Sequence, residues 1–172
     1  MKQVWACAVI PLVFTACNLL AEETDSNYII GTIEEQGYPV IYKLIPYQPE
    51  PDTITKYPWL TVVSWEYSKT VRNGMPPEKI NQDMIALEDA FSEEFEDRAG
   101  AKWVYNRTGN GRKEFVYYIQ NRTTFTAALN WALATHKRYP IEITFYDDTT
   151  WQDFIDLVEI FEEAKLREKD DT

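Results

Sequence analysis

The chain has 172 residues and is 45% apolar, with 6 Trp, 11 Tyr and 8 Phe. This length and apolar content suit one folded domain with a real core, and they exclude a chain that is disordered throughout. The formal net charge is −11, and no stripe of Lys and Arg offsets it, so we expect no binding to DNA or RNA phosphates.

The two cysteines both lie near the start of the chain, at Cys7 and Cys17. Everything after Cys17 therefore lacks a disulfide, a thiolate nucleophile and a cysteine metal ligand. The only histidine is His136, which excludes a histidine-rich metal site. We accordingly expect no bound metal and no cofactor.

The first 16 residues have the pattern of an export signal. Lys2 precedes an eleven-residue apolar run over residues 4–14. This run is too short to span a bilayer, which takes about 20 apolar residues, but it fits the apolar region of a signal peptide. The stretch FTAC, which ends at Cys17, resembles the lipobox of bacterial lipoproteins, although Phe14 stands where leucine is usual.

The lipobox resemblance implies cleavage before Cys17 and attachment of fatty acyl groups, such as palmitate, to that cysteine. Two or more acyl chains hold a protein durably on a membrane. We therefore expect a signal peptide over residues 1–16, lipidation at Cys17, a polar tether over 17–27, and a membrane-anchored protein of the cell envelope that faces the periplasm or the surface. The alternatives are a soluble form cleaved after Ala21, and an uncleaved anchor or cytosolic helix.

Extended structure is predicted for the next part of the chain. Residues 28–46 predict a β-hairpin, because two runs of alternating apolar residues flank the turn EEQG. Residues 47–58 contain several prolines, which remove hydrogen-bond donors, so we expect a linker over the surface. The stretch WLTVVSWEYS, which starts at Trp59, alternates with period two, as is typical of a strand.

Three helices are predicted after this strand. The apolar residues of 80–95 recur at three- and four-residue spacing, and Gly100 follows as a stop. Residues 123–138 repeat this pattern and end in basic residues that suit the negative end of a helix. A last helix follows Asp148 or Thr149, either of which would cap it, and residues 164–172 are expected to form a flexible tail.

The remaining strands complete a recognisable order. The stretches AKWVYNRT and KEFVYYIQ predict a hairpin around the turn GNG, and IEITFY predicts another strand. The first six elements from Trp59 onward follow the split βαβ order of ferredoxin-like folds, with four antiparallel strands and both helices on one face. We therefore predict a single α+β domain over 28–172, with a ferredoxin-like core over 59–163, an N-terminal hairpin and an extra C-terminal helix.

Several stretches of the chain resemble the bacterial family called domain of unknown function 695 (DUF695). They are YPWLTVVSWEY, NGMP, ALEDAF, NRTGNGRKEFVYY and YPIEITFYDDTTWQDF, and the resemblance runs from Tyr28 to Phe161. The family has no established activity. The resemblance therefore implies a fold, and it implies no catalytic residues.

Few residues have the pattern of a catalytic site. His136 lies at a basic helix end, where a positive side chain suits the helix dipole. Asp147 and Asp148 lie at a strand-to-helix junction, where carboxylates can bind a cation, but helix capping explains them more simply. A hydrolase with a carboxylate site near Asp147 and Asp148 is therefore the alternative to a non-enzymatic protein.

A basic cluster and a set of aromatic side chains are the candidate binding surfaces. Arg107, Arg112 and Lys113 flank the GNG turn, and simple solvation of that turn is the competing explanation. Aromatic residues at strand positions, Trp103 and Tyr117 among them, would stack on a ligand if one sheet face were open. Core packing under the extra hairpin and helix is the competing explanation, because large exposed apolar patches are rare. The leading hypothesis is an envelope lipoprotein that binds another envelope protein or a small ligand and has no enzymatic activity.

Overall fold

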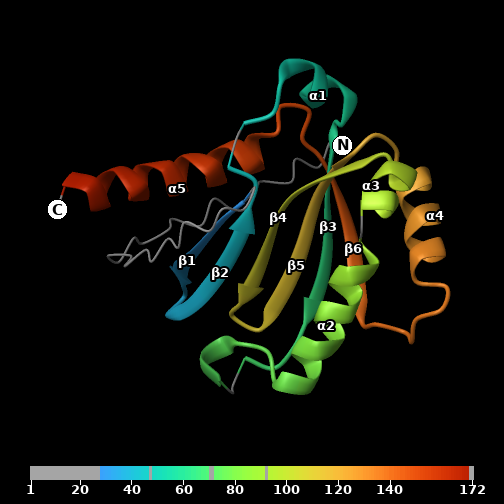
Figure 1. The fold of residues 1–172 in the computed structure, drawn as a ribbon, viewed down its shortest axis with the longest axis horizontal. Coiled ribbons are helices and arrows are strands. Elements are labelled where there is room, and N and C mark those ends of the chain that lie inside the picture. The colour runs from blue at the N-terminus through green and yellow to red at the C-terminus, as the bar shows by residue number, and fades with distance from the viewer. Residues whose placement is uncertain (1–27, 47, 70–71, 92, 171–172) are drawn as a thin grey trace, which may run out of the picture.

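The computed structural model describes residues 28–46, 48–69, 72–91 and 93–170 and contains one sheet flanked by helices (Figure 1). The predicted signal peptide, Cys17 and the tether lie outside the described residues. In the described part, no helix has both the length and the apolar content needed to cross a membrane. The strands are β1 (Ile29–Glu35), β2 (Tyr38–Leu44), β3 (Trp59–Glu66), β4 (Ala101–Gly109), β5 (Arg112–Ile119) and β6 (Ile141–Asp147). The helices are α1 (Pro51–Lys56), α2 (Glu78–Ala90), α3 (Glu93–Ala99), α4 (Arg122–Ala132) and α5 (Gln152–Asp170), with a short 3₁₀ helix η1 (Arg72–Gly74).

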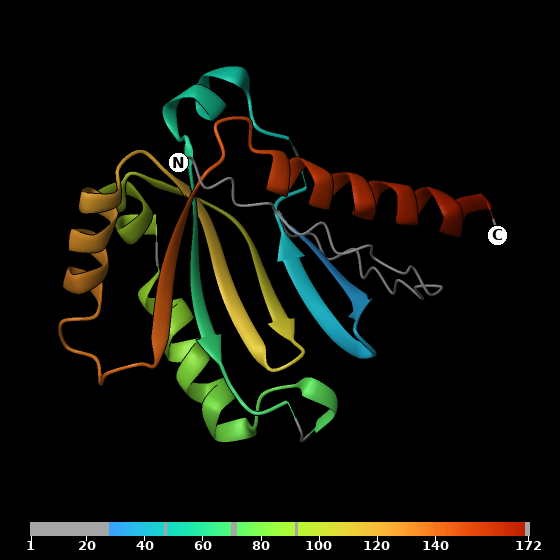
Figure 2. The ribbon, with the colours of Figure 1, turned by 180° about the vertical axis from the view of Figure 1, so that it is seen from behind.

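The six strands form a single antiparallel sheet in the order β1-β2-β4-β5-β3-β6 (Figures 1 and 2). The predicted α+β class is thereby confirmed. The N-terminal hairpin belongs to this sheet, because β2 pairs with β4 from Val40 opposite Gly109 to Leu44 opposite Tyr105. The sheet is therefore wider than the four strands that the sequence predicts for the core.

Two tight turns close the hairpins. Gln36 and Gly37 join β1 to β2, and Asn110 and Gly111 join β4 to β5, all four with positive φ angles between 48° and 80°. This is the geometry of two-residue type I′ turns, whose twist matches that of the flanking strands. Both turns lie where the sequence predicts them, and the second one fixes which residues of β4 and β5 face each other.

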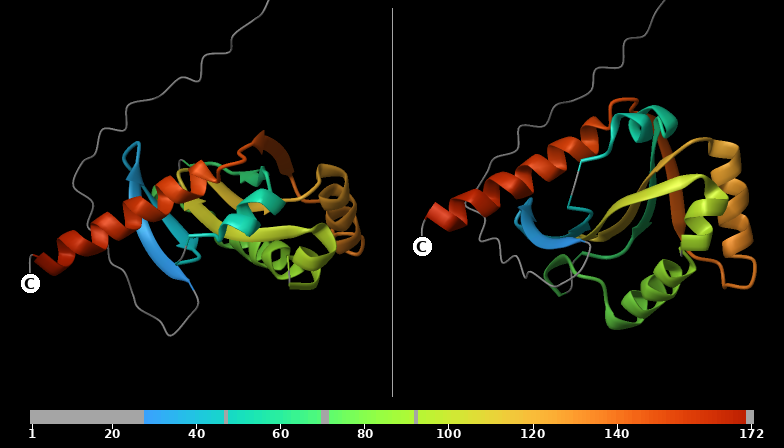
Figure 3. Two further views of the ribbon diagram at one scale, coloured as in Figure 1. Left: turned by 90° about the horizontal axis from the view of Figure 1, so that it is seen from above. Right: turned by 45° about the horizontal axis from the view of Figure 1, so that its top comes forward.

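Helices cover both faces of the sheet (Figure 3). The inner strands β3, β4 and β5 contribute side chains to a core on each side. On one face α2, α3 and α4 pack against apolar side chains that include Phe115, Tyr117 and Ile119. On the opposite face α5 packs against a second core that includes Val116 and Tyr118. At Gly31, a Cβ atom would overlap the ring of Phe161. The glycine thus permits the close approach of α5 to β1.

The helices differ from the sequence prediction in four places. The expected linker contains α1, and the helix predicted over 80–95 is broken between Ala90 and Glu93. The break lets Phe91 and Phe95 both place their rings against Tyr117, at centroid distances of 6.0 and 5.9 Å. Helix α4 ends at Ala132, so the basic residues that follow lie beyond it, and α5 continues through the expected tail to Asp170.

Candidate functional site

The three basic residues predicted as one surface lie on two faces of the β4–β5 hairpin. Successive side chains of a strand point to opposite faces, so Arg112 lies on the α5 face and Lys113 on the α2 face. Arg107 lies on the α5 face, opposite Glu114. Arg107 and Lys113 are only 5% and 8% exposed, whereas the Arg112 side chain is 46% exposed. Two of the three are therefore buried and ion-paired rather than solvated at the turn.

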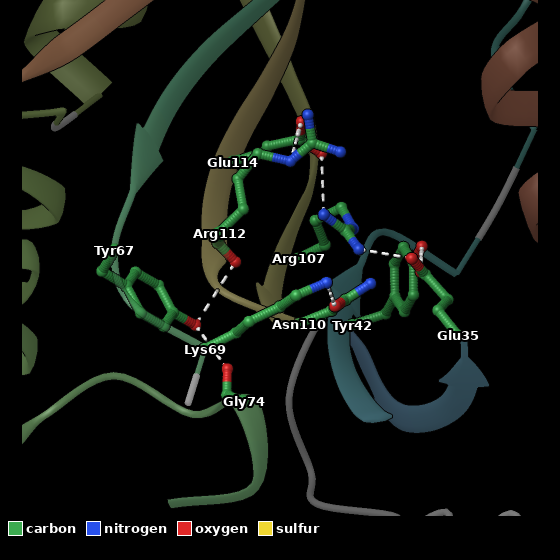
Figure 4. Close-up of polar contacts among 9 residues, drawn as sticks. All are labelled: Glu35, Tyr42, Tyr67, Lys69, Gly74, Arg107, Asn110, Arg112 and Glu114. Atoms are coloured by element: carbon green, nitrogen blue, oxygen red, sulfur yellow. Dashed lines mark hydrogen bonds and ion pairs between the residues drawn. The ribbon is translucent and has the colours of Figure 1, made fainter. Parts of the chain in front are cut away.

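On the α5 face, Arg107 is the centre of a charged network that joins four strands (Figure 4). Its Nη2 donates to Oε2 of Glu35 at 2.5 Å, and its Nη1 lies 3.5 Å from Oε2 of Glu114. Arg112 Nε lies 3.1 Å from the other oxygen of Glu114, and the Tyr42 hydroxyl donates to Glu35 at 2.6 Å. Two guanidinium groups and two carboxylates thus alternate across β1, β4 and β5, with the Tyr42 hydroxyl of β2 bonded to one end.

The protonation of this network is set mainly by burial. Burial, reinforced by the Glu35 carboxylate, raises the pKa of Tyr42 well above its ordinary value. Burial also raises the pKa of Glu114, although Arg107 and Arg112 act in the opposite direction. The geometry holds these charges in fixed pairs, which favours a role in joining the strands.

A second set of hydrogen bonds lies at the turn of the β4–β5 hairpin and is also drawn in Figure 4. The Tyr67 hydroxyl donates to the carbonyl oxygen of Gly74 at 3.2 Å, and burial raises the pKa of Tyr67 to about 12. Lys69 Nζ donates to Oδ1 of Asn110 at 3.4 Å. These contacts attach the end of β3 to the β4–β5 turn and to η1.

On the other face, the carboxylate of Glu88 in α2 interacts with polar side chains from three strands. Lys113 Nζ donates to it at 2.6 Å and Asn106 Nδ2 at 3.1 Å, while Lys43 Nζ lies 3.7 Å away. The Asn106 side-chain oxygen accepts from Trp103 Nε1 at 2.8 Å. We call this set the Glu88 network; it consists of Glu88, Lys43, Lys113, Asn106 and Trp103.

All members of the Glu88 network except Lys113 line a cleft of about 350 Å³ between the sheet and α2–α3. Lys43 Nζ lies 4.4 Å from the ring centroid of Tyr28 and 5.6 Å from that of Trp103. The β4 register shifts between Trp103 and Tyr105, as at a β-bulge, a feature that is common beside functional sites. The cleft is lined by Tyr28, Lys43, Glu88, Asp89, Phe91, Glu96, Trp103, Asn106, Phe115 and Tyr117.

Asp148 is the cap of α5, as the capping explanation predicts. Its carboxylate accepts from the backbone N–H groups of Gln152 at 3.0 Å and Asp153 at 3.2 Å, and from the Tyr118 hydroxyl at 2.6 Å. Partial burial alone would raise the pKa of Asp148, but these hydrogen bonds together lower it. Asp147 is exposed at the end of β6. This geometry gives no support to a hydrolytic carboxylate pair.

His136 does not lie at the end of a helix. Because α4 ends at Ala132, His136 falls in the loop that follows, where its Nδ1 lies 3.0 Å from the Tyr139 hydroxyl. Within the described residues, no group of three or more His, Cys, Asp and Glu side chains is arranged to hold a metal ion.

Sequence reasoning did not find the Glu88 network as a site. The predicted basic residue Lys113 and the aromatic residue Trp103 both belong to it, but their partners Lys43 and Glu88 lie on β2 and α2. Alternation along the strands places Trp103, Phe115 and Tyr117 on one face of the sheet. This shared face was the signal in the sequence that could have indicated the site. Of these three, Trp103 is partly exposed and the other two are buried.

Fold and site together define an α+β protein with one antiparallel sheet and two polar networks on opposite faces of the same hairpin. Residues 28–158 match the family of unknown function DUF695, and the chain belongs to this family. A comparison with curated proteins found no match, and a comparison with solved structures found none either.

Proposed function

We propose that the protein is a lipid-anchored binding protein of the bacterial cell envelope, and that the cleft over the Glu88 network holds a small zwitterionic ligand, such as an amino acid or a dipeptide. The cleft carries the binding proposal. Its volume of about 350 Å³ is at the lower end of the range for small-molecule sites, and its lining combines aromatic rings with a few charged groups.

The charges of the cleft specify both ends of the ligand. Lys43 is half-buried, and its ammonium group makes one long contact with Glu88 and lies over two rings, so it has donors left for a ligand carboxylate. Asp89 and Glu96 add carboxylates to the same cleft, and a ligand ammonium group suits them. Trp103 and Tyr28 provide the apolar wall between these charges.

The ligand proposal is tested by titrating the folded domain with free amino acids and glycyl dipeptides. We expect a saturable shift of the Trp103 indole N–H resonance with at least one member of this set. Lys43→Met should weaken that binding about tenfold or more, because a charge-assisted hydrogen bond is lost. Lys102→Met, which removes an exposed lysine next to Trp103 in the chain, should change it less than about twofold. Titrations that leave the Trp103 resonance unmoved throughout the set would refute the proposal.

The anchoring proposal rests on the sequence FTAC and is tested separately. Wild type and Cys17→Ser are expressed in a bacterial host supplied with labelled palmitate. We expect wild type to be labelled and to partition with membranes, because two or more acyl chains give stable anchoring. Cys17→Ser should be unlabelled and keep its apolar signal segment. An unlabelled, soluble wild-type protein would contradict the lipoprotein proposal.

We also propose that β3 to β6, with α2 to α4, form a ferredoxin-like unit to which β1, β2 and α5 are added. The order β4-β5-β3-β6 supports this, as does the packing of α2, α3 and α4 on one face.

A further inference from the structure

Strand β6 is the outer strand of the sheet on the side away from the N-terminal hairpin (Figure 2). Among the described residues it pairs with β3 alone. Natural edge strands are usually blunted by lysine, proline or a bulge. The β6 sequence IEITFYD has no lysine or proline and pairs in an unbroken register, and its charged residues are Glu142 and Asp147. It therefore presents a regular edge of backbone groups.

The direction of these backbone groups follows from the pairing with β3. The Asp148 N–H donates to the carbonyl oxygen of Pro58 at 3.2 Å, and hydrogen-bonded pairs alternate along an antiparallel ladder. Thr144 and Tyr146 therefore direct their N–H groups towards β3. Ile143 and Phe145 direct theirs away from the sheet, where an added strand would accept them.

A groove of about 300 Å³ runs beside the first half of β6. Its floor is apolar, and its rim carries Lys137 and Arg138. Lys137 pairs with Asp83, whereas Arg138 is exposed and makes no ion pair in the described part of the chain. The apolar floor consists of Leu129, Leu133, Ile141 and Ile143. Beyond it, the Arg122 guanidinium lies 5.6 Å from the ring centroid of Phe145.

We infer that this edge binds an extended acidic peptide from another protein, which adds as a strand next to β6. Main-chain hydrogen bonds would supply affinity, and alternate apolar side chains would enter the groove. The basic rim selects acidic residues in a protein whose net charge is −11. Asp83 neutralises Lys137, so Arg138 is the cation of the rim that remains for a ligand. Glu142 of β6 is exposed, but its side chain points to the face of the sheet opposite Ile141 and Ile143, away from the groove. A second copy of the chain brings the same strong negative charge and is the less favoured occupant.

The probe is a fluorescent nonapeptide that alternates valine with threonine in its centre and carries a pair of glutamates at each end, so that a glutamate faces the rim in either direction of binding. Its binding to the protein is measured by anisotropy. We expect saturable binding, and at least about tenfold weaker binding of the same peptide with lysine in place of glutamate. Arg138→Glu should weaken the acidic peptide about fivefold and strengthen the lysine peptide. Equal binding of both peptides would overturn the inference, and so would concentration-dependent dimerisation that the peptide does not reverse.

A matched pair of variants isolates the backbone contribution. Ile143→Ala and Ile143→Pro both lose the side chain, but only the proline variant loses the outward N–H group, a change that edge strands tolerate. We expect the proline variant to bind the acidic peptide about fivefold more weakly than the alanine variant. In wild type, the Ile143 and Phe145 amide resonances should shift on binding. Equal affinities of the two variants would overturn the inference. Amide resonances of Ile143 and Phe145 that do not shift in wild type would also overturn it, and this measurement does not depend on how well the proline variant folds.

Discussion

Arg107→Met is expected to lower the free energy of unfolding by about 3 kcal/mol, because it removes the buried guanidinium that the partly buried carboxylates of Glu35 and Glu114 share. Arg107 is buried, and the loss of one partner of a buried pair exposes the full cost of the remaining charge. Urea unfolding at pH 7 measures the change. The β1–β2 hairpin should lose amide-exchange protection first, since Glu35 belongs to it.

The stability that Arg107→Met loses should also depend on pH in a predictable direction. Burial raises the pKa of Glu114 already in the wild type, and removal of Arg107 takes away a neighbour that lowers it. A carboxyl group whose pKa is higher in the folded state favours folding below its unfolded pKa, and this contribution is lost as pH rises through the folded pKa. The difference in stability between wild type and Arg107→Met should therefore shrink as pH falls from 7 towards 4. A difference that is constant over this range would contradict the argument.

Two further variants separate the charge from the side-chain volume. Arg112→Met removes the more exposed arginine of the same network and should cost less than about 1 kcal/mol. Adding Glu114→Gln to Arg107→Met removes one stranded carboxylate and should recover part of the loss. If Arg112→Met were as damaging as Arg107→Met, burial would not be the cause.

The strands and hairpins of this fold were predictable because their signals are local. Alternation with period two marked β3, and the residues of both tight turns, with Gly37 and Gly111 as their second members, marked the hairpins. The break at Phe91 was not predictable, because apolar spacing continues across it to Phe95. That break depends on where Phe115 and Tyr117 lie in the folded sheet.

The candidate site was harder to predict than the fold, and for a physical reason. Neighbouring strand residues point apart, so Arg112 and Lys113 can be assigned to opposite faces from the sequence. Their partners cannot, because Glu88 lies 25 residues from Lys113, and Glu35 lies 72 residues from Arg107. Charge clusters in a sequence thus identify residues of interest, while burial and ion pairing depend on tertiary contacts.

Trp151→Ala is expected to lower the free energy of unfolding by about 3–5 kcal/mol and to release the start of α5. Trp151 is 1% exposed and stacks on Tyr118 with ring centroids 3.9 Å apart and an angle of 9°. Its Nε1 also donates to the carbonyl oxygen of Tyr57 at 2.9 Å. Truncation therefore leaves a large cavity and a carbonyl group without its indole partner. Urea unfolding gives the change, and amide exchange along α5 shows where it acts.

The backbone of Trp151 makes this prediction more specific. Its φ angle is +59°, a conformation that costs non-glycine residues free energy, so Trp151→Gly should be at least as stable as Trp151→Ala despite the greater flexibility of glycine. Trp131→Ala is the control, because Trp131 is 48% exposed and should cost less than about 1 kcal/mol. If Trp151→Ala lost no more than Trp131→Ala, the contacts of Phe154 and Phe161 with the sheet would suffice to hold α5 in place.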